Sequence, residues 1–283
     1  MRELSYYPGC SLHGTSVEYD ESIREVISAL DIDLKELEDW NCCGASSGHS
    51  IGGKLGHELS TRNLTLAAKS GRDVVVPCAA CFNRLRSAQV AVLEEKHAPS
   101  PETAVKLRSL ADVLSESALL ARIAQRVRKP LDQISAVTYY GCLVVRPPVV
   151  TGAANYEDPR DIDVVLEAMG VKMKTWSYKT QCCGGGLTLS RPDAVTRLSK
   201  KILDRVREIG AECVVAICPM CLMNLEICQF EAMRSGEDKG KPPIPIVYLT
   251  EIVGVALGLP RAPQWLGKHL VDPRPLFRAK GLI

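Results

Sequence analysis

The sequence lacks the features that would link it to nucleic acid, a membrane or secretion. It carries 35 basic and 33 acidic residues with no basic block, so we expect no nucleic-acid partner. Its longest apolar stretches, such as residues 252–259, fall well below the ~20 residues that a membrane-spanning helix requires. Residues 1–7 contain no basic region followed by an apolar segment, so we expect a reducing, cytoplasmic compartment.

Two common redox motifs are absent as well. The sequence has no G-x-G-x-x-G fingerprint for a flavin or nicotinamide cofactor. It also lacks the closely spaced C-x₂-C-x₂-C-x₃-C run that holds ferredoxin clusters. If the chain takes part in redox chemistry, its electrons must therefore arrive from another subunit.

What the sequence does contain is twelve cysteines, ten of which form two matching sets. Each set has a leading cysteine, then a Cys-Cys-Gly triplet, then a CxxC motif. From the second cysteine of the doublet to the first of the CxxC, the step is 35 residues in both sets (78 − 43 and 218 − 183). The first set is Cys10, Cys42, Cys43, Cys78 and Cys81, and the second is Cys142, Cys182, Cys183, Cys218 and Cys221. The chain therefore contains two copies of one site-building unit.

The pattern of strands and helices repeats with the cysteines. Apolar runs predict strands, and i, i+3, i+4 periodicity predicts helices between them. The predicted strands are residues 4–7, 32–37 and 74–76 in the first copy and 136–140, 171–175 and 214–217 in the second. Such alternation implies parallel βαβ units, so we expect two repeated three-layer α/β domains with short parallel sheets, related by a pseudo-two-fold axis. The helix-ending segment at Lys129-Pro130 places the boundary between domains 1–131 and 132–283.

This architecture accounts for the positions of the cysteines. In open α/β sheets, ligands bind beyond the carboxyl ends of the strands. In each copy the leading cysteine, the doublet and the CxxC all follow predicted strands, so five thiols should converge from three loops. Each CxxC also opens a predicted helix, where unpaired N–H groups and the helix dipole favour a thiolate.

Several kinds of site could use these cysteines. Core packing gives no reason for five cysteines to recur in register, and a disulfide relay is a further minor alternative. Tetrahedral zinc needs four ligands, whereas each set offers five. Iron–sulfur clusters, which cysteine thiolates hold, are the favoured interpretation, and zinc in one site stays open as an alternative.

At these residues the chain resembles the CCG-domain family, C-x(n)-C-C-G-x(n)-C-x-x-C, which includes the B subunit of heterodisulfide reductase. The resemblance covers nearly the whole chain, and both copies keep the leading cysteine. It implies two non-cubane four-iron four-sulfur clusters, each a pair of smaller iron–sulfur units that share an iron and a sulfide. Carried over to this sequence, the cluster-binding residues are the ten cysteines of the two sets.

The resemblance also implies an activity and partners. The chain would be the catalytic subunit of a heterodisulfide reductase-type complex, an oxidoreductase that reduces a disulfide such as that joining coenzyme M and coenzyme B. Electrons would come from a ferredoxin-like iron–sulfur subunit and a flavoprotein subunit. Two other functions stay open: an electron-transfer subunit that serves a quinone or another redox enzyme, and a zinc-stabilised scaffold.

Cleavage of one disulfide by two centres predicts how those centres lie. The two sulfurs of a disulfide are about 2.05 Å apart, so both centres must reach them at once. We therefore expect the Cys42-Cys43 and Cys182-Cys183 loops on opposite walls of one inter-domain cleft, where ligand sites often form.

Other side chains near the motifs receive more ordinary interpretations. His13 and His49, close after the leading cysteine and the doublet of the first copy, are the candidate proton donors, although ordinary polar roles in loops are the favoured interpretation. Arg146 and Lys179 flank the loops of the second copy, and we expect them to be solvated surface charges.

The remaining cysteines and two pairs of tyrosines are expected in the core. Cys213 and Cys228 have no counterparts in the first copy, which favours buried apolar thiols. The pairs Tyr6-Tyr7 and Tyr139-Tyr140 precede the leading cysteines, and core packing is a better interpretation for them than a redox relay.

Overall fold

The computed structural model describes residues 2–283 apart from 46–47, 49–50 and 237–239. Its described residues form two four-stranded parallel sheets, of order β2-β1-β3-β4 and β6-β5-β7-β8, so the halves share one topology. The strands are β1 (Arg2–Tyr6), β2 (Ile32–Glu36), β3 (Val74–Val76), β4 (Leu107–Ser109), β5 (Ser135–Tyr139), β6 (Lys172–Met173), β7 (Cys213–Ala216) and β8 (Ile246–Tyr248). This confirms the repeated α/β domains and adds one strand to each predicted sheet.

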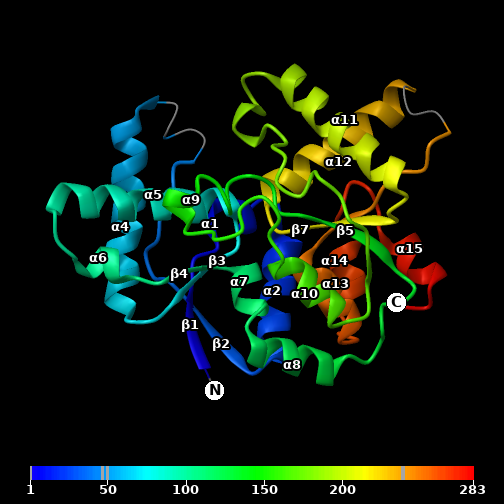
Figure 1. The fold of residues 1–283 in the computed structure, drawn as a ribbon, viewed down its shortest axis with the longest axis horizontal. Coiled ribbons are helices and arrows are strands. Elements are labelled where there is room, and N and C mark those ends of the chain that lie inside the picture. Colours follow the sequence, from blue (N-terminus) through cyan, green and yellow to red (C-terminus); the bar gives the residue numbers. More distant parts are fainter. Residues whose placement is uncertain (1, 46–47, 49–50, 237–239) are drawn as a thin grey trace.

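Helices connect the strands within each half. The first half contains α1 (Gly9–Leu12), α2 (Val17–Ala29), α4 (Gly53–Ser70), α5 (Ala79–Lys96), α6 (Pro101–Ala104), α7 (Leu110–Leu114) and α8 (Ser117–Arg126). The second contains α9 (Pro148–Thr151), α10 (Asp161–Glu167), the 3₁₀ turn η1 (Gly185–Leu187), α11 (Pro192–Ile209), α12 (Pro219–Ser235), α13 (Leu249–Ala256), α14 (Ala262–Leu266) and α15 (Arg274–Ala279). The long helices form two packed pairs, α4 with α5 and α11 with α12, at opposite sides of Figure 1.

Both CxxC motifs open a long helix, as predicted. The first cysteine of each motif, Cys78 or Cys218, is the N-cap residue of α5 or α12. Pro219 at the first helical position costs little, because its missing N–H would have had no partner in the helix. The second cysteine of each motif then lies in the first turn.

The edge strand β6 is shorter than the predicted strand 171–175. Its residues Lys172 and Met173 pair with β5, and the N–H of Lys174 then donates to the carbonyl of Ala136 at 2.9 Å. Farther along, the indole N–H of Trp176 donates to the carbonyl of Thr138 in β5 at 2.9 Å. At this point a side-chain donor replaces the backbone N–H, and the regular pairing of β6 with β5 ends.

Two reciprocal contacts join the halves. α2 of the first half packs against α13 and α14 of the second, and α10 of the second packs against α7 and α8 of the first. In their own halves α2 and α10 follow the leading cysteine, while α7 and α13 follow the fourth strand, so the two contacts are related by pseudo-two-fold symmetry. At the first contact the rings of Tyr19 and Tyr248 stack with centroids 3.9 Å apart. The predicted domain boundary falls in the segment 127–134 between α8 and β5.

Candidate metal centres

In each half a tyrosine near the leading cysteine holds the start of the doublet in the same way. The hydroxyl of Tyr7 donates to the carbonyl of Asn41 at 2.7 Å, and that of Tyr139 donates to the carbonyl of Gln181 at 2.6 Å. Both acceptors directly precede a doublet, so Tyr7 corresponds to Tyr139, three residues before the leading cysteine. All four tyrosines of the two pairs are at most 1% exposed, which confirms their place in the core.

Close packing requires a glycine between the tyrosine and the leading cysteine. Gly9 and Gly141 have φ angles of +71° and +66°. A Cβ at Gly9 would lie 2.9 Å from Cys81 Sγ, and one at Gly141 would lie 2.8 Å from Cys221 Sγ. The last cysteine of each CxxC therefore lies directly against the turn that presents the leading cysteine, and no larger residue fits there.

The thiols of the first set lie in close pairs. Cys10 Sγ is 3.7 Å from Cys42 Sγ, and Cys43 Sγ is 3.1 Å from Cys81 Sγ. The N–H of Gly44 points at Cys42 Sγ from 3.4 Å. All twelve cysteines lie in the described part of the chain, and none forms a disulfide. The three loops of the first half thus bring their thiols together as the sequence predicted.

The second set repeats this arrangement. Cys183 Sγ is 3.5 Å from Cys221 Sγ, and the N–H of Gly184 donates to Cys182 Sγ at 3.2 Å. The neighbouring thiol of Cys142, helped by that N–H, outweighs burial and lowers the pKa of Cys182 to about 6. A thiol so shifted is already a thiolate at neutral pH, which is the form that binds metal.

The donor chemistry of each set fits an iron–sulfur cluster. The second doublet cysteine and both CxxC cysteines are buried in each half, whereas Cys10, Cys42 and Cys182 reach the surface. Among the described residues, no three His, Cys, Asp or Glu side chains are arranged to hold one metal ion. In the first set the thiols instead form a connected group, in which Cys42 contacts Cys10 and Cys43, and Cys81 contacts Cys43 and Cys78. Cysteine thiolates are the ligands that hold iron–sulfur clusters.

The two sets meet between the halves of the molecule. A cavity of about 200 Å³, which we term the thiol cavity, is lined by all five cysteines of the second set. The first half supplies its other wall, with Ala45, Ala79, Ala80 and Arg84. Cys78 faces Cys218 across the boundary, and this contact is the main cause that lowers the pKa of Cys78. Cys182 and Cys183 therefore line an inter-domain cavity as expected. On the opposite wall the lining includes Ala45, two residues after the first doublet, but neither Cys42 nor Cys43.

Two polar side chains at this site were not predicted. Arg84 and Asn224 each lie three residues after the last CxxC cysteine, one turn along the helix and on the same face. Arg84 lines the thiol cavity and makes no hydrogen bond or ion pair with another described residue. Asn224 Nδ2 lies 3.6 Å from Cys183 Sγ, and Thr188 Oγ1 donates to Asn224 Oδ1 at 3.1 Å. The i, i+3 spacing from the CxxC is the sequence signal that identifies both.

The candidate proton donors remain predictions. His13 is exposed, with Nε2 3.3 Å from Glu36 Oε1 and its ring packed edge-on against Trp40. It is not among the residues that line the thiol cavity. His49 lies outside the described residues.

Of the two expected surface charges, only Arg146 is exposed. Lys179 is 5% exposed, with Nζ 2.8 Å from Asp163 Oδ1 and 2.7 Å from Asp158 Oδ1. The surface interpretation of Lys179 was wrong, because residues that follow α9 cover it and supply the carboxylates that a buried ammonium requires.

Cys213 and Cys228 are buried, as expected. Cys213 is fully buried in β7, and burial raises its pKa to about 12. Cys228 is 7% exposed, and its Sγ lies 3.6 Å from the carbonyl of Thr196. Neither residue lines the thiol cavity.

The family model of the cysteine-rich domain, CCG, matches the chain twice, at residues 4–86 and 136–226. The chain belongs to the CCG family. Each match runs from the first strand of one half, through its leading cysteine and doublet, into the helix that follows its CxxC. Each half of the chain is therefore built on a CCG domain.

Similar proteins cover nearly the whole of this CCG chain. It is 27% identical, over 98% of its length, to the 8-methylmenaquinol:fumarate reductase membrane anchor subunit of Wolinella succinogenes, of which it covers 99%. It is 24% identical, over 94% of its length, to the B subunit of the ferredoxin:CoB-CoM heterodisulfide reductase of Methanosarcina mazei, of which it covers 92%. A protein of Archaeoglobus profundus, named for its likeness to the B subunit of heterodisulfide reductase, is 26% identical over 97% of the chain, which covers 96% of it.

One solved structure shows the same fold. It is the crystal structure of a hypothetical protein from Helicobacter pylori, with a TM-score of 0.69 and 13% identity. The match covers 96% of this chain and 52% of that one. Within the described ranges, none of the CCG chain's helices combines the length and apolar character of a membrane span.

Proposed function

We propose that this CCG chain is the catalytic subunit of a heterodisulfide reductase-type complex. In this proposal the ten cysteines of the two sets hold two non-cubane four-iron four-sulfur clusters, and the substrate is a disulfide. When bound, the clusters supply the single electrons that open the S–S bond. The relatives named after heterodisulfide reductase, which match this chain over most of their length, support the proposal.

The observation that carries the proposal is the thiol cavity between the halves. One wall holds a complete five-cysteine set, and the other is built by the loop after the first doublet and by the start of α5. Whole small molecules occupy pockets of about 300–1,000 Å³. A cavity of about 200 Å³ instead suits the reacting end of a substrate whose remainder lies outside.

The cavity walls supply two properties that disulfide reduction needs. Arg84 places a positive charge where the sulfur atoms of the substrate gain negative charge as their bond opens. Ala79, Ala80 and Met220 give the cavity apolar surface that keeps water away from the reacting sulfurs. Asn224, behind Cys183, donates toward a thiolate at that position.

The proposal includes partner subunits and a location. Because the sequence carries no flavin or nicotinamide fingerprint, a ferredoxin-like subunit and a flavoprotein subunit deliver the electrons. They dock outside the thiol cavity, in a cytoplasmic complex. We keep the domain boundary at residues 131 and 132, within the segment that joins α8 to β5.

A second candidate function is electron transfer without a disulfide substrate. Here the CCG chain exchanges electrons with a quinone or another redox enzyme. It is favoured by the 27% identity, over 98% of the chain, to the subunit named for a menaquinol:fumarate reductase. A zinc-stabilised scaffold is the remaining alternative.

Metal analysis and spectroscopy separate these functions. Anaerobically purified protein should contain about eight iron atoms and eight acid-labile sulfides per chain; stoichiometric zinc without iron would leave only the scaffold. The protein is then reduced with dithionite, freed of excess reductant and mixed with the coenzyme M–coenzyme B disulfide or with a menaquinone analogue, and paramagnetic signals are recorded. A signal that needs the disulfide supports the proposal, and one that needs only the quinone selects electron transfer.

A variant tests the role of the cavity arginine. Arg84→Gln should weaken the disulfide-dependent signal while leaving the iron content unchanged. The matched control is Arg234→Gln, because Arg234 is exposed and paired with Glu231 at 2.7 Å. Loss of the signal in both variants would show that it reports general damage rather than contact with the substrate.

A further inference from the structure

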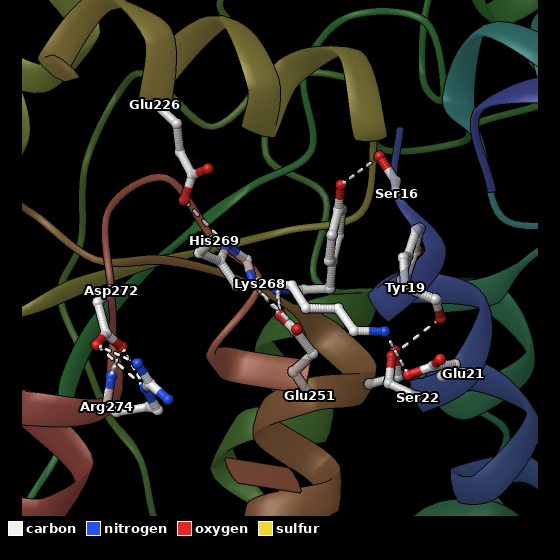
Figure 2. A network of polar contacts seen from close by, with 12 residues as sticks. Ser16, Tyr19, Glu21, Ser22, Glu226, Glu251, Lys268, His269, Asp272 and Arg274 are labelled. Atoms are coloured by element: carbon white, nitrogen blue, oxygen red, sulfur yellow. Dashed lines mark hydrogen bonds and ion pairs between the residues drawn. The ribbon is translucent and has the colours of Figure 1, made fainter. Parts of the chain in front are cut away.

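In the second half a histidine fills a pocket beside the CxxC helix (Figure 2). The side chain of His269 is fully buried, with Nδ1 2.9 Å from Glu226 Oε1 and Nε2 3.0 Å from both oxygens of Glu251. The N–H of Leu270 donates to Glu226 Oε2 at 3.1 Å. Burial raises the pKa of Glu18, and the charge of Glu251 nearby adds to this. The segment after α14 thus closes this histidine pocket with a basic side chain among three acids.

The first half has a counterpart for two of these acids. Arg86 takes the place of Glu226, because each lies five residues after the last cysteine of its CxxC. Asp112 takes the place of Glu251, because each is the third residue of the helix that follows the fourth strand. The same positions around the pocket therefore exist in both CCG domains, with one acid exchanged for an arginine.

The third acid has a counterpart as well. The carboxylates of Asp20 and Asp163 each accept a hydroxyl group from the first strand of their sheet, at 2.7 and 3.0 Å, so the two are equivalent. Glu18 and Asp161 each lie two residues before them. Asp161 therefore takes the place of Glu18.

The space that His269 takes in the second half corresponds to a cavity of about 470 Å³ in the first. Arg86, Asp112 and Asp161 all line this arginine cavity. Its apolar lining includes Phe82, Leu107, Val144 and Val145. The chain after α8 leads on into β5, so the first half has no tail that closes the cavity as the second half's tail closes the histidine pocket.

Arg86 carries a charge that the described residues do not balance. Its Nε donates to the carbonyl of Val150 at 3.1 Å, and its Nη1 donates to Gln89 Oε1 at 3.0 Å. Among the described residues it forms no ion pair with a carboxylate, and burial lowers the pKa of Arg86. Arg108 at the same cavity is, by contrast, paired with Asp112. A half-buried guanidinium that bonds only neutral groups keeps N–H donors for an anion.

We propose that the arginine cavity binds a small organic monocarboxylate, with its carboxylate on Arg86 and its apolar body against Phe82 and Val145. The fork of a guanidinium matches the two oxygens of a carboxylate. The other cations of the lining, Lys106 and Arg108, are already paired with Asp73 and Asp112. Asp161 therefore disfavours a second negative charge in the same space, and a dicarboxylate binds more weakly.

The arginine cavity lies directly behind the cysteine sites. Phe82 follows Cys81, and Val144 lies two residues after Cys142. Asn83 holds this region together, because its Nδ2 donates to the carbonyls of Leu143 and Arg146 at 3.0 and 2.9 Å. A bound carboxylate therefore stabilises the packing of the turn that contains Cys142 on α5.

Calorimetric titration of the anaerobically purified, metal-containing protein tests the proposal. The probes are butyrate, its neutral isostere butyramide, the dicarboxylate glutarate, and phosphate. We expect butyrate to bind at a single site per chain and butyramide not to bind. Arg86→Gln should weaken butyrate binding roughly 10- to 100-fold, the worth of a charged hydrogen bond. Arg86→Lys should recover only part of the lost affinity, because it restores the charge but not the fork, and Arg234→Gln should leave the affinity unchanged.

The contrary results are equally specific. Equal binding of butyrate and butyramide by the unaltered protein would overturn the proposal, and this comparison does not depend on any variant folding. Tighter binding of glutarate or phosphate than of butyrate would exclude the monocarboxylate class. Unchanged butyrate affinity in a folded Arg86→Gln protein would place the ligand elsewhere, and no binding of any probe would also refute the site.

Discussion

The two CCG domains have the same cysteine framework in different surroundings. In both, a tyrosine hydroxyl holds the residue before the doublet, and a glycine with positive φ packs on the last CxxC cysteine. Differences begin one turn later on the CxxC helix, where Arg84 corresponds to Asn224 and Arg86 to Glu226. The repeat thus keeps the residues that present the thiols. The halves diverge where each helix faces the other half or the C-terminal segment.

Removal of a doublet cysteine should have the largest effect, the loss of one complete site. Cys43→Ala and Cys183→Ala should each remove about half of the bound iron, because the adjacent cysteine is already committed to the same cluster. Iron and acid-labile sulfide are measured after anaerobic purification. Cys213→Ala is the matched control, since Cys213 is buried in β7 and does not line the thiol cavity. Equal loss of iron in this control would show that the ligand assignment is wrong.

Removal of the His269 side chain should have the next largest effect, and the first half has no equivalent histidine. His269→Ala should lower the free energy of unfolding by about 3–5 kcal/mol, because it leaves Glu226 and Glu251 buried without their partner. Anaerobic urea unfolding measures this. His13→Ala, at an exposed histidine 3.3 Å from Glu36, should cost less than about 1 kcal/mol. Similar costs for the two variants would contradict the role given to His269.

The histidine pocket also predicts a pH dependence. Burial alone would lower the pKa of His269, but Glu251 and Glu226 outweigh it and hold that pKa well above its ordinary value. The stabilisation is therefore fully present below the unfolded-state pKa of about 6.5 and is lost as pH rises through the raised folded-state value. Relative to His269→Gln, the unaltered protein should lose stability on the alkaline side. A constant difference between the two proteins from about pH 6 to pH 9 would count against this linkage.

Substitution of the packed glycines should have a smaller and symmetric effect. In Gly9→Ala and Gly141→Ala the new Cβ would lie 2.9 and 2.8 Å from a cysteine sulfur, so overpacking should cost about 1–3 kcal/mol. Gly71→Ala is the control, because Gly71 has a similar φ of +64° but open space around it. This variant therefore measures the cost of the positive φ without the cost of overpacking. Thermal unfolding and iron content are compared. The packing argument fails if Gly141→Ala is no more harmful than Gly71→Ala.

Loss of the anchoring hydroxyls should have the smallest effect and should distinguish the halves. Tyr139→Phe should cost about 1 kcal/mol of unfolding free energy, the typical worth of a hydrogen bond, because the carbonyl of Gln181 loses its donor. Tyr7→Phe should cost less, since Asn63 Nδ2 still donates to the carbonyl of Asn41 at 2.8 Å. Chemical unfolding of the two variants measures the difference. The reverse order would show that the anchors do not act as described.

Much of the framework could be predicted from the sequence because it is local or repeated. The spacing of the cysteines and the alternation of strands and helices led to the paired α/β domains and the converging thiols. The fourth strands, β4 and β8, were missed although β3 is equally short, because β3 is Val-Val-Val whereas β4 reads Leu-Arg-Ser and β8 directly follows the Gly- and Pro-rich segment 236–245. The length of β6 was overestimated because the indole of Trp176, rather than backbone, bonds the next carbonyl of β5.

The rest of the site depends on contacts between distant segments, which no local pattern encodes. His269 joins Glu226, 43 residues away in the sequence, and nothing around either residue marks the pair. Lys179 sits in a polar loop, yet Asp163 and other residues after α9 cover it. The arginine cavity forms only where a loop of the second half lies against α5 of the first.

The packing of α2 on α13 and of α10 on α7 is that of a symmetric dimer joined into a single chain. Two separate copies would lose their shared cavity on dilution, and every substitution would appear on both walls. Because residues 127–134 tether the halves, the cavity forms at any protein concentration. The tether also lets corresponding positions differ. An arginine can face one wall while an asparagine supports the other, an asymmetry that identical subunits could not produce.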